Sequence, residues 1–319
     1  MNKILVLGGS GFVGRHVCEK LVRQGWHVTV PTRRASQAQA IQHLPGLTVV
    51  VADVDDEATL RRLLPGHDAV IHLVAILHGN AAAFERTHVE LPAKLARACL
   101  AAGVTRLVHL SALGADPTNS ANAPSHYLRS KSRGEAALLA AVAQGLQLTV
   151  LRPSVIFGAG DQFLNLFARL QRVFPVMPLA GAQARFQPVW VEDVAQAIAN
   201  CLQDPATVGQ TFEACGPQIY TLAQLVQLAG RLSRGQARTI IPLPGALGHL
   251  QAGLMECLPG PTLMSRDNLD SMRVANVTSS QGPGLQALDI TPAALSAIAP
   301  TYLSPSDRYV TLRGKYLRR

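Results

Sequence analysis

The stretch MNKILVLGGSGFVG, residues 1–14, decides the fold of this chain. An apolar run at 4–7 leads directly into a turn that contains glycines at positions 8, 9, 11 and 14. We expect Gly8 to permit the tight turn, Gly11 to let a pyrophosphate approach the backbone, and Gly14 to let the next helix pack closely on the strand. The N-terminal amides of that helix would face the phosphates. The stretch therefore predicts the first unit of a dinucleotide-binding fold.

Strands and helices alternate through the first half of the chain. Helices are expected at about 12–24, 35–43, 57–63, 83–101 and 126–144. Apolar runs typical of buried strands lie between them, at 26–31, 47–53, 68–75, 105–112 and 146–154. Near-continuous apolar strands separated by helices indicate a parallel sheet covered on both faces. We therefore expect an α/β protein with a doubly wound parallel sheet, the Rossmann fold.

The alternation becomes looser after about residue 156. The next elements expected are a helix, a short strand, a helix and a short strand, at 163–170, 187–191, 192–202 and 209–214. Beyond residue 216, helical patterns are interrupted by PLPG, LPGP and QGPG. We expect a Rossmann domain at 1–215, with 156–186 on its substrate side. A smaller, mostly helical C-terminal lobe at 216–319 would cover the carboxyl edge of the sheet.

The composition indicates a globular protein with a large core. Hydrophobic residues make up 48% of the chain and charged residues 15%, which argues against disorder. No apolar run reaches the roughly 18 residues of a membrane span, and the start lacks a secretory signal. We therefore expect a cytoplasmic protein. The net charge of +9 favours anionic surfaces, and with the basic tail RGKYLRR it makes peripheral association with the inner membrane surface an option.

The cysteines and the basic residues exclude two other classes. Five cysteines are scattered through the chain, never as a CxxC pair, so we expect buried apolar thiols, with neither a disulfide framework nor a metal site. The basic residues do not form a stripe interleaved with aromatic side chains. Nucleic acid is therefore not expected as a partner.

Arginines follow the second expected strand, where a nucleotide site selective for NAD would place a carboxylate. Arg33 and Arg34 stand about twenty residues after the glycine turn. Their charge and forked donors match a 2′-phosphate, so we expect NADP(H) in preference to NAD(H), although a solvated basic turn would have the same sequence. The ends of the third and fourth strands would line the adenine and the path to the nicotinamide, with Asp53 and Val54 at the first and Val74 and Ala75 at the second.

A serine, a tyrosine and a lysine form the candidate catalytic group. Ser111 closes the fifth strand, and Tyr127 and Lys131 lie one turn apart on the following helix. A lysine ammonium beside a phenol favours the tyrosinate, so we expect a lowered pKa for Tyr127, as a general acid/base near neutral pH requires. Lys131 would also hold the nicotinamide ribose, and Ser111 would orient a carbonyl or hydroxyl. A bare YxxxK pattern also occurs as an ordinary surface pair.

Several motifs together resemble the short-chain dehydrogenase/reductase superfamily in its extended or atypical branch, which includes proteins like NAD-dependent epimerases and dehydratases. These motifs are GGSGFVG at 8–14, LSALGA at 110–115, YLRSK at 127–131, LRPSVIFG at 151–158 and QPVWVEDVA at 187–195. Within the branch the chain is similar to the NADPH-binding accessory subunits of respiratory complex I and their bacterial relatives. That similarity lies in HLVAILHG at 72–79, YLRSKSRGE at 127–135 and RPSVIFGAGDQFLN at 152–165.

The resemblance implies a role for each matching residue. It implies dinucleotide contacts from Gly8, Ser10, Gly11, Phe12, Val13 and Gly14, and 2′-phosphate contacts near Arg33 and Arg34. It implies a triad of Ser111, Tyr127 and Lys131, with Pro153 to Val155 bordering the nicotinamide. His88 departs from the family, since many extended members have an asparagine there. We interpret His88 as a histidine of the core or of a helix face rather than as part of a proton relay.

Two classes of function remain open from the sequence. The first is an NADP(H)-dependent oxidoreductase acting on a carbonyl, an alcohol or a quinone-like apolar substrate, with Tyr127 as acid/base. The Leu-rich segment at 240–260 could shape an apolar pocket, although a packed helix pair is the commoner explanation of such a segment. The second is a non-catalytic NADPH holder that serves a respiratory complex similar to complex I, or a quinone-biosynthesis complex. A homo-oligomer paired through the helices at 83–101 and 126–144 is compatible with both.

Overall fold

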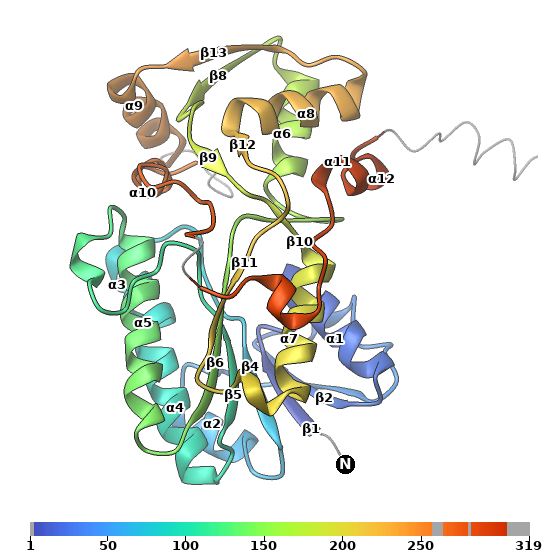
Figure 1. Ribbon diagram of the computed structural model, residues 1–319, viewed down its shortest axis with the longest axis vertical. Coiled ribbons are helices and arrows are strands. Elements are labelled where there is room, and N and C mark those ends of the chain that lie inside the picture. The colour runs from blue at the N-terminus through green and yellow to red at the C-terminus, as the bar shows by residue number, and fades with distance from the viewer. Residues whose placement is uncertain (1–2, 257–263, 280–281, 305–319) are drawn as a thin grey trace, which may run out of the picture.

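The centre of the molecule is a seven-stranded parallel sheet in the order β11-β6-β5-β4-β1-β2-β3 (Figure 1). The computed structural model describes residues 3–256, 264–279 and 282–304. The strands are β1 (Lys3–Leu7), β2 (His27–Thr32), β3 (Leu47–Val51), β4 (Ala69–His72), β5 (Arg106–Leu110), β6 (Gln147–Pro153) and β11 (Thr211–Ala214). The order reverses between β1 and β4, as in a doubly wound sheet. The predicted fold class is therefore confirmed.

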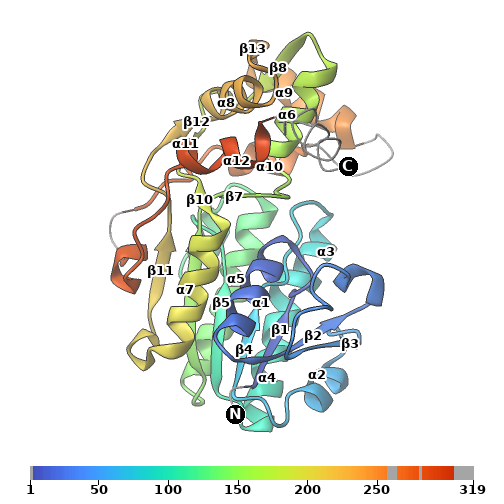
Figure 2. The ribbon, with the colours of Figure 1, turned by 90° about the vertical axis from the view of Figure 1, so that its right-hand side faces the viewer.

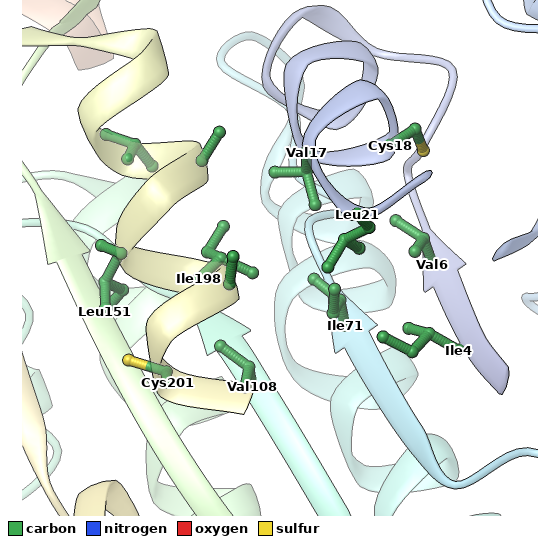
Figure 3. Packing of buried hydrophobic residues seen from close by; sticks show 14 of the residues in the cluster. Ile4, Val6, Val17, Cys18, Leu21, Ile71, Val108, Leu151, Ile198 and Cys201 are labelled. Carbon is green, nitrogen blue, oxygen red and sulfur yellow. The ribbon is translucent and has the colours of Figure 1, made fainter. Parts of the chain in front are cut away.

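Each face of the sheet buries its own cluster of apolar side chains. Along β1 the residues alternate: Ile4 and Val6 enter one cluster, and Leu5 and Leu7 enter the other. Helices α1 (Phe12–Arg23) and α7 (Val191–Gln203) cover the first face, where Figure 3 shows Val17, Leu21 and Ile198 packed over the strands. Helices α2 (Glu57–Leu63), α4 (Leu91–Ala102) and α5 (His126–Val142) cover the second. A continuous apolar strand is required because both faces are buried.

The helix predicted at 35–43 is wrong. Only a single 3₁₀ turn, η1 (Ala35–Ala38), forms, and turns follow it. Ile41 donates its backbone amide to Ala38, and Leu44 donates to Ile41, so the hydrogen bonds span three residues. Ala38 and Ile41, which are three apart, are buried. The apolar spacing of this polar segment therefore fits the tighter turn and not an α-helix.

The helix predicted at 83–101 is interrupted. It is divided into α3 (Ala81–Glu85), a π-helical turn η2 (Arg86–Glu90) and α4. Pro92 lacks the amide that would donate to the carbonyl of His88 in a regular helix. The same carbonyl lies against α5, where a Cβ on Gly134 would be 1.7 Å from its oxygen. The proline and this close crossing together account for the wider turn.

The remaining elements form a smaller part of the molecule beyond the carboxyl edge of the sheet (Figure 2). Its helices are α6 (Leu164–Val173), α8 (Leu222–Arg234), α9 (Gly245–Glu256), α10 (Arg266–Ser271), α11 (Leu295–Ile298) and α12 (Pro300–Leu303). Its strands are β7 (Ile156–Phe157), β8 (Val176–Ala180), β9 (Arg185–Phe186), β10 (Val189–Trp190), β12 (Tyr220–Thr221) and β13 (Thr239–Leu243). The 3₁₀ turns η3 (Ser120–Asn122), η4 (Pro205–Thr207) and η5 (Leu285–Leu288) pack instead against α5, α7 and β11 around the central sheet.

A parallel pair of strands, β8 and β13, crosses this part of the molecule, where mostly helix was expected. Thr239 lies opposite Val176, and Leu243 lies opposite Ala180. The prolines at 242 and 244 concealed β13 from the sequence pattern, because proline is tolerated on an edge strand that needs no donor there. Among the described residues, no helix is both long and apolar enough to cross a membrane.

Candidate nucleotide-binding and catalytic site

The glycine turn has the geometry that the sequence predicted. Gly8 adopts φ +83°, a left-handed conformation that favours glycine. A Cβ on Gly14 would lie 2.2 Å from the carbonyl oxygen of Gly8, so α1 packs directly on the turn. Gly11 is the N-cap residue of α1, whose first turn begins at Phe12 and Val13. Free amides at a helix start that is this close to a glycine turn fit a pyrophosphate.

The other expected cofactor residues follow the carboxyl ends of neighbouring parallel strands. The backbone of Val74 is 3.1 Å from the position of a Cβ on Gly8, so the turns after β1 and β4 are in contact. The further positions at this edge are Arg33 and Arg34 after β2, Asp53 and Val54 after β3, Ala75 after β4, Ser111 after β5, and Pro153 and Val155 around the end of β6. Ligands of open α/β sheets bind at such an edge.

Arg33 and Arg34 are exposed at the end of β2. Neither forms an ion pair with any residue that the structure describes. The hydroxyl of Thr32, by contrast, donates to the carbonyl of Arg34 at 3.2 Å and holds the turn. Two guanidinium groups on a fixed turn, free of carboxylate partners, can receive an anionic group.

Tyr127 and Lys131 lie in the first two turns of α5, beginning at the N-cap Ser125. Lys131 is buried, and its Nζ donates to the carbonyl of Leu110 at 2.8 Å. Burial lowers the pKa of Lys131 to about 8, while nearby Glu135 opposes this shift. An ammonium has three donors, so two remain beside the end of β5 for a ribose or a phenol.

The lowered pKa expected for Tyr127 is wrong. Enclosure of the phenol raises its pKa to about 12. The ring packs edge-on against Phe84 at 6.2 Å and against His88 at 5.5 Å between ring centres. Desolvation of the phenolate in this aromatic setting therefore outweighs the nearby lysine, which is engaged with a backbone carbonyl.

Ser111 is directed at a buried carboxylate, a contact that the sequence did not indicate. Its hydroxyl donates to Oε2 of Glu135 at 2.8 Å. The same oxygen accepts from Nε of Arg152 at 3.1 Å, and the second carboxylate oxygen pairs with the Arg152 guanidinium. Glu135 is fully buried and lies two turns after Tyr127 on α5. The Ser111 hydroxyl is thus hydrogen-bonded to the buried Glu135–Arg152 ion pair and is not free to orient a substrate carbonyl.

His88 is a core residue, as the sequence interpretation held. Its Nε2 accepts from the amide of Ile76 at 3.0 Å, so the proton lies on Nδ1. Nδ1 then donates to the hydroxyl of Ser130 at 2.9 Å, and this hydroxyl donates to the carbonyl of Tyr127 at 2.8 Å. Burial and the charge of Lys131 lower the pKa of His88 to about 3. A neutral imidazole therefore connects the loop after β4 to the start of α5.

A second buried pair, His72 and His109, lies on neighbouring strands below this network. Their Nδ1 atoms are 2.9 Å apart and their rings are stacked with centres at 5.0 Å. One Nδ1 must carry a proton and the other must accept it. Burial lowers both pKa values, that of His72 to about 3. Both rings are therefore neutral at physiological pH.

Two residues of the later chain reach the site and were missed by sequence reasoning. Asp267 of α10 accepts from the amides of His126 and Tyr127, at 2.6 and 3.0 Å. Asn276 accepts through Oδ1 from the hydroxyl of Ser154 at 2.6 Å and from the amide of Val155 at 3.0 Å. Neither residue belongs to a sequence motif. For Asp267 the available signal is that the first turn of α5 has no acidic residue of its own, so its free amides need a partner from another segment.

The Leu-rich segment forms a strand and a helix around a cavity of about 580 Å³. β13, β8, α9 and α10 border it, mostly with small apolar side chains, and His249 and Arg273 add polar groups. The segment thus combines the two explanations that the sequence left open, a pocket and packed helices. Four cysteines, Cys18, Cys99, Cys201 and Cys215, are buried thiols, as expected. Cys257 and the basic tail lie outside the described residues.

Comparison with known proteins agrees with this geometry. Residues 4–215 match the NAD dependent epimerase/dehydratase family. The chain is 33% identical over 301 residues to NADH dehydrogenase [ubiquinone] 1 alpha subcomplex subunit 9, mitochondrial, of Mus musculus, covering 91% of this chain and 76% of that protein. It is 29% identical to the ceramide reductase of Caulobacter vibrioides over 76% of this chain and 75% of that protein.

Among solved structures, Pal from Bacillus thuringiensis has the same fold, with a TM-score of 0.74 over 94% of this chain and 97% of that chain at 18% identity. The resemblance drawn from the motifs is therefore confirmed, both for the superfamily and for the relatives among complex I subunits. A nicotinamide dinucleotide is the cofactor that the family match supports. The chain belongs to the NAD-dependent epimerase/dehydratase family.

Proposed function

We propose that this protein binds NADP(H) and reduces an apolar carbonyl compound, or oxidises the corresponding alcohol. The observation that carries the proposal is the placement of Tyr127 and Lys131 on successive turns of α5, at the sheet edge that holds the glycine turn. A ceramide reductase among the relatives supports a substrate with long apolar chains. The cavity bordered by α9 and α10 supplies apolar surface in the lobe, and α10 also contacts the start of α5 through Asp267.

The residues fit the cofactor and divide its binding among them. The Gly8–Gly14 contact leaves no side chain between turn and helix, as a pyrophosphate site requires. Arg33 and Arg34 would bind a 2′-phosphate, because they are exposed and free of carboxylates. Asp53 and Val54 would flank the adenine, and Val74, Ala75, Pro153 and Val155 would border the nicotinamide. NADP(H), when bound, supplies or accepts the hydride.

The chain's own chemistry is a proton transfer at Tyr127. Its phenol would donate a proton to the carbonyl oxygen as the hydride arrives at carbon, leaving an alcohol and a tyrosinate. Lys131, with a pKa of about 8, is mostly protonated at neutral pH and stabilises that tyrosinate. Since the Ser111 hydroxyl is held by Glu135, the substrate oxygen would depend on Tyr127 alone unless this hydrogen bond is exchanged.

The engaged Ser111 also favours a second candidate, a non-catalytic NADPH holder. Here Lys131, Tyr127 and the glycine turn would bind the cofactor tightly, and the protein would serve a respiratory or quinone-biosynthesis assembly. The relatives named as subunits of NADH dehydrogenase support this alternative. Both candidates require the same cofactor, so they differ in turnover and not in binding.

Calorimetry with NADPH and NADH tests the cofactor first. We expect Arg33→Ala/Arg34→Ala to weaken NADPH binding by about tenfold or more while leaving NADH binding nearly unchanged, because a charge-assisted phosphate contact is lost. Arg61→Ala/Arg62→Ala is the matched control, since it removes two adjacent exposed arginines from α2. Equal affinity of the wild type for both nucleotides would contradict the NADP(H) preference.

Oxidation of NADPH, followed by its absorbance, then separates the two candidates. A short-tailed ubiquinone analogue and a medium-chain ketone are suitable carbonyl probes. The oxidoreductase requires turnover that Tyr127→Phe abolishes although NADPH still binds. If NADPH co-purifies and no probe is reduced, the holder is favoured.

A further inference from the structure

Helix α9 exposes its leucines and buries its small residues, which is the reverse of an ordinary surface helix. Leu247, Leu250 and Leu254 are 53, 62 and 64% exposed. At about 100° per residue these three leucines fall within about 60° of one another, on one face. The opposite face carries Gly248 and Ala252, which are buried against the strand pair and α10. A Cβ on Gly248 would be 2.7 Å from that of Ala180, so the helix cannot rotate its leucines inward.

A second group of exposed apolar side chains lies at the same end of the molecule. Val173, the last residue of α6, and Phe174, which follows it, are 73 and 50% exposed. Ile241 of β13 is 50% exposed, on a strand that is paired with β8. Figures 1 and 2 both place β13, β8, α9 and the end of α6 at the end of the long axis farthest from the N-terminus. We call these six side chains, from α9, β13 and the end of α6 with the following Phe174, the apical face.

Arginines lie beside this face at the end of α6. Segments 162–186 and 222–255 contain six arginines and no aspartate or glutamate, and Glu256, which ends α9, is paired with Arg266. Arg234 and Arg238 donate to the carbonyl of Gln171, which places both of them at the end of α6 beside Val173 and Phe174. Arg172 is exposed in the last turn of the same helix. Exposed leucine and phenylalanine next to arginine combine insertion into acyl chains with attraction to phosphate headgroups.

We propose that the apical face docks on the surface of an anionic phospholipid bilayer. The leucines of α9 and Phe174 enter the region between headgroups and acyl chains, and Arg172, Arg234 and Arg238 contact lipid phosphates. The positive charge beside the apolar side chains favours a lipid bilayer over a partner protein as the occupant. A partner protein would have to offer many carboxylates around an apolar centre. The docking places the lobe cavity near the membrane and does not depend on which reaction the site performs.

Flotation of the purified full-length protein with lipid vesicles tests this inference. Vesicles of phosphatidylcholine alone are compared with vesicles in which a third of the lipid is phosphatidylglycerol. We expect binding to the anionic vesicles, weakened by salt, and a loss of more than about tenfold in Leu247→Ser/Leu250→Ser/Leu254→Ser and in Phe174→Ser. The control Leu139→Ser/Val142→Ser changes two exposed apolar residues of α5 and should bind like the wild type.

Further variants separate the tail and the fold from the apical face. Arg313, Lys315, Arg318 and Arg319 replaced by glutamine remove the tail charges, and the leucine variant should still reduce binding in that background. Circular dichroism and thermal unfolding of the same samples show that each variant is folded, independently of whether the protein binds NADPH. The inference is overturned if the wild type ignores anionic vesicles or if the leucine variant binds them fully. It is also overturned if the leucines instead hold together a dimer in sedimentation, since the face would then be an interface between copies.

Discussion

Asp267 accepts a hydrogen bond at 3.0 Å from the backbone amide of Tyr127, a residue 140 positions earlier in the chain. Its other oxygen accepts from His126 at 2.6 Å, so one carboxylate caps the first turn of the helix that bears the candidate acid/base. A negative charge at a helix N-terminus is favourable because the first amides lack partners there. The position of Tyr127 is therefore set partly by α10, on the lobe.

Replacing Asp267 with alanine should destabilise the protein by about 1 kcal/mol, the typical effect of removing a helix cap. The start of α5 would also become less ordered, so NADPH affinity should fall. Urea unfolding and calorimetry measure the two effects. Asp270→Ala, on the same short helix, removes a surface partner of Arg273 and His249 and should change both quantities little. Equal effects of the two substitutions would show that Asp267 has no special role.

Gly14→Ala should cost about 3 kcal/mol or more of unfolding free energy, and dinucleotide binding should be lost. The added Cβ would lie 2.2 Å from the carbonyl oxygen of Gly8, and a backbone atom cannot move aside as a side chain can. Thermal unfolding with and without NADPH reports both losses. Gly245→Ala at the start of α9 meets nothing within 4 Å and should be neutral or slightly stabilising. A stable Gly14 variant with normal binding would contradict the tight helix contact.

Arg152→Met should destabilise the protein by about 3 kcal/mol, because Glu135 would remain buried without its cation. Ser111→Ala removes one hydrogen bond to the same carboxylate and should cost about 1 kcal/mol. Chemical denaturation compares the two variants. Arg97→Met breaks an exposed pair with Glu57 and serves as the charge-matched control, with an effect of about 0.5 kcal/mol. If Arg152→Met and Arg97→Met unfold alike, the buried pair is not a structural element.

Acid should destabilise the protein through its neutral buried histidines. The pKa of His88 is lowered to about 3 in the folded state from an ordinary 6.5, so between these values the unfolded chain binds more protons and stability falls as pH falls. From pH 8 to pH 5 this one residue accounts for about 2 kcal/mol. Urea unfolding of wild type and His88→Gln at both values measures it.

The stability gap between wild type and His88→Gln should therefore narrow by about 2 kcal/mol at the lower pH. His72 and His109 face the same network and titrate in both proteins, so they do not affect the comparison. A gap that is constant across pH would mean that His88 has the same pKa in the folded and the unfolded chain.

The fold could be predicted where the residues of one segment determine its structure without contacts to distant segments. The run at 4–7 is apolar because both of its faces are covered, and the turn needs glycine at positions 8 and 14 for local steric reasons. The prediction failed at 83–101, where the break arises from Pro92 together with a contact to Gly134. It failed again at β13, whose partner strand lies 63 residues earlier, as Thr239 lies opposite Val176.

The candidate site follows the same distinction. Local patterns contain Tyr127, Lys131 and the residues after each strand. Their location at one edge of the sheet could therefore be predicted, and their catalytic and binding roles are still predictions. Asp267 and Asn276 reach the site through tertiary contacts only. The pKa of Tyr127 was predicted in the wrong direction because spacing on a helix shows the neighbouring charge but not the enclosing aromatic rings.

The parallel pairing of β8 with β13 also determines when the molecule can be completed during synthesis. The chain leaves the lobe after β10, adds β11 to the edge of the central sheet, and returns to the lobe with α8 and β13. A nascent chain that ends after residue 214 can therefore finish the sheet but not the lobe. Until α8 and β13 emerge from the ribosome, the apolar side of α6 lacks the helix that packs on it and β8 has an unpaired edge, so this interval is when the newborn protein most needs a chaperone.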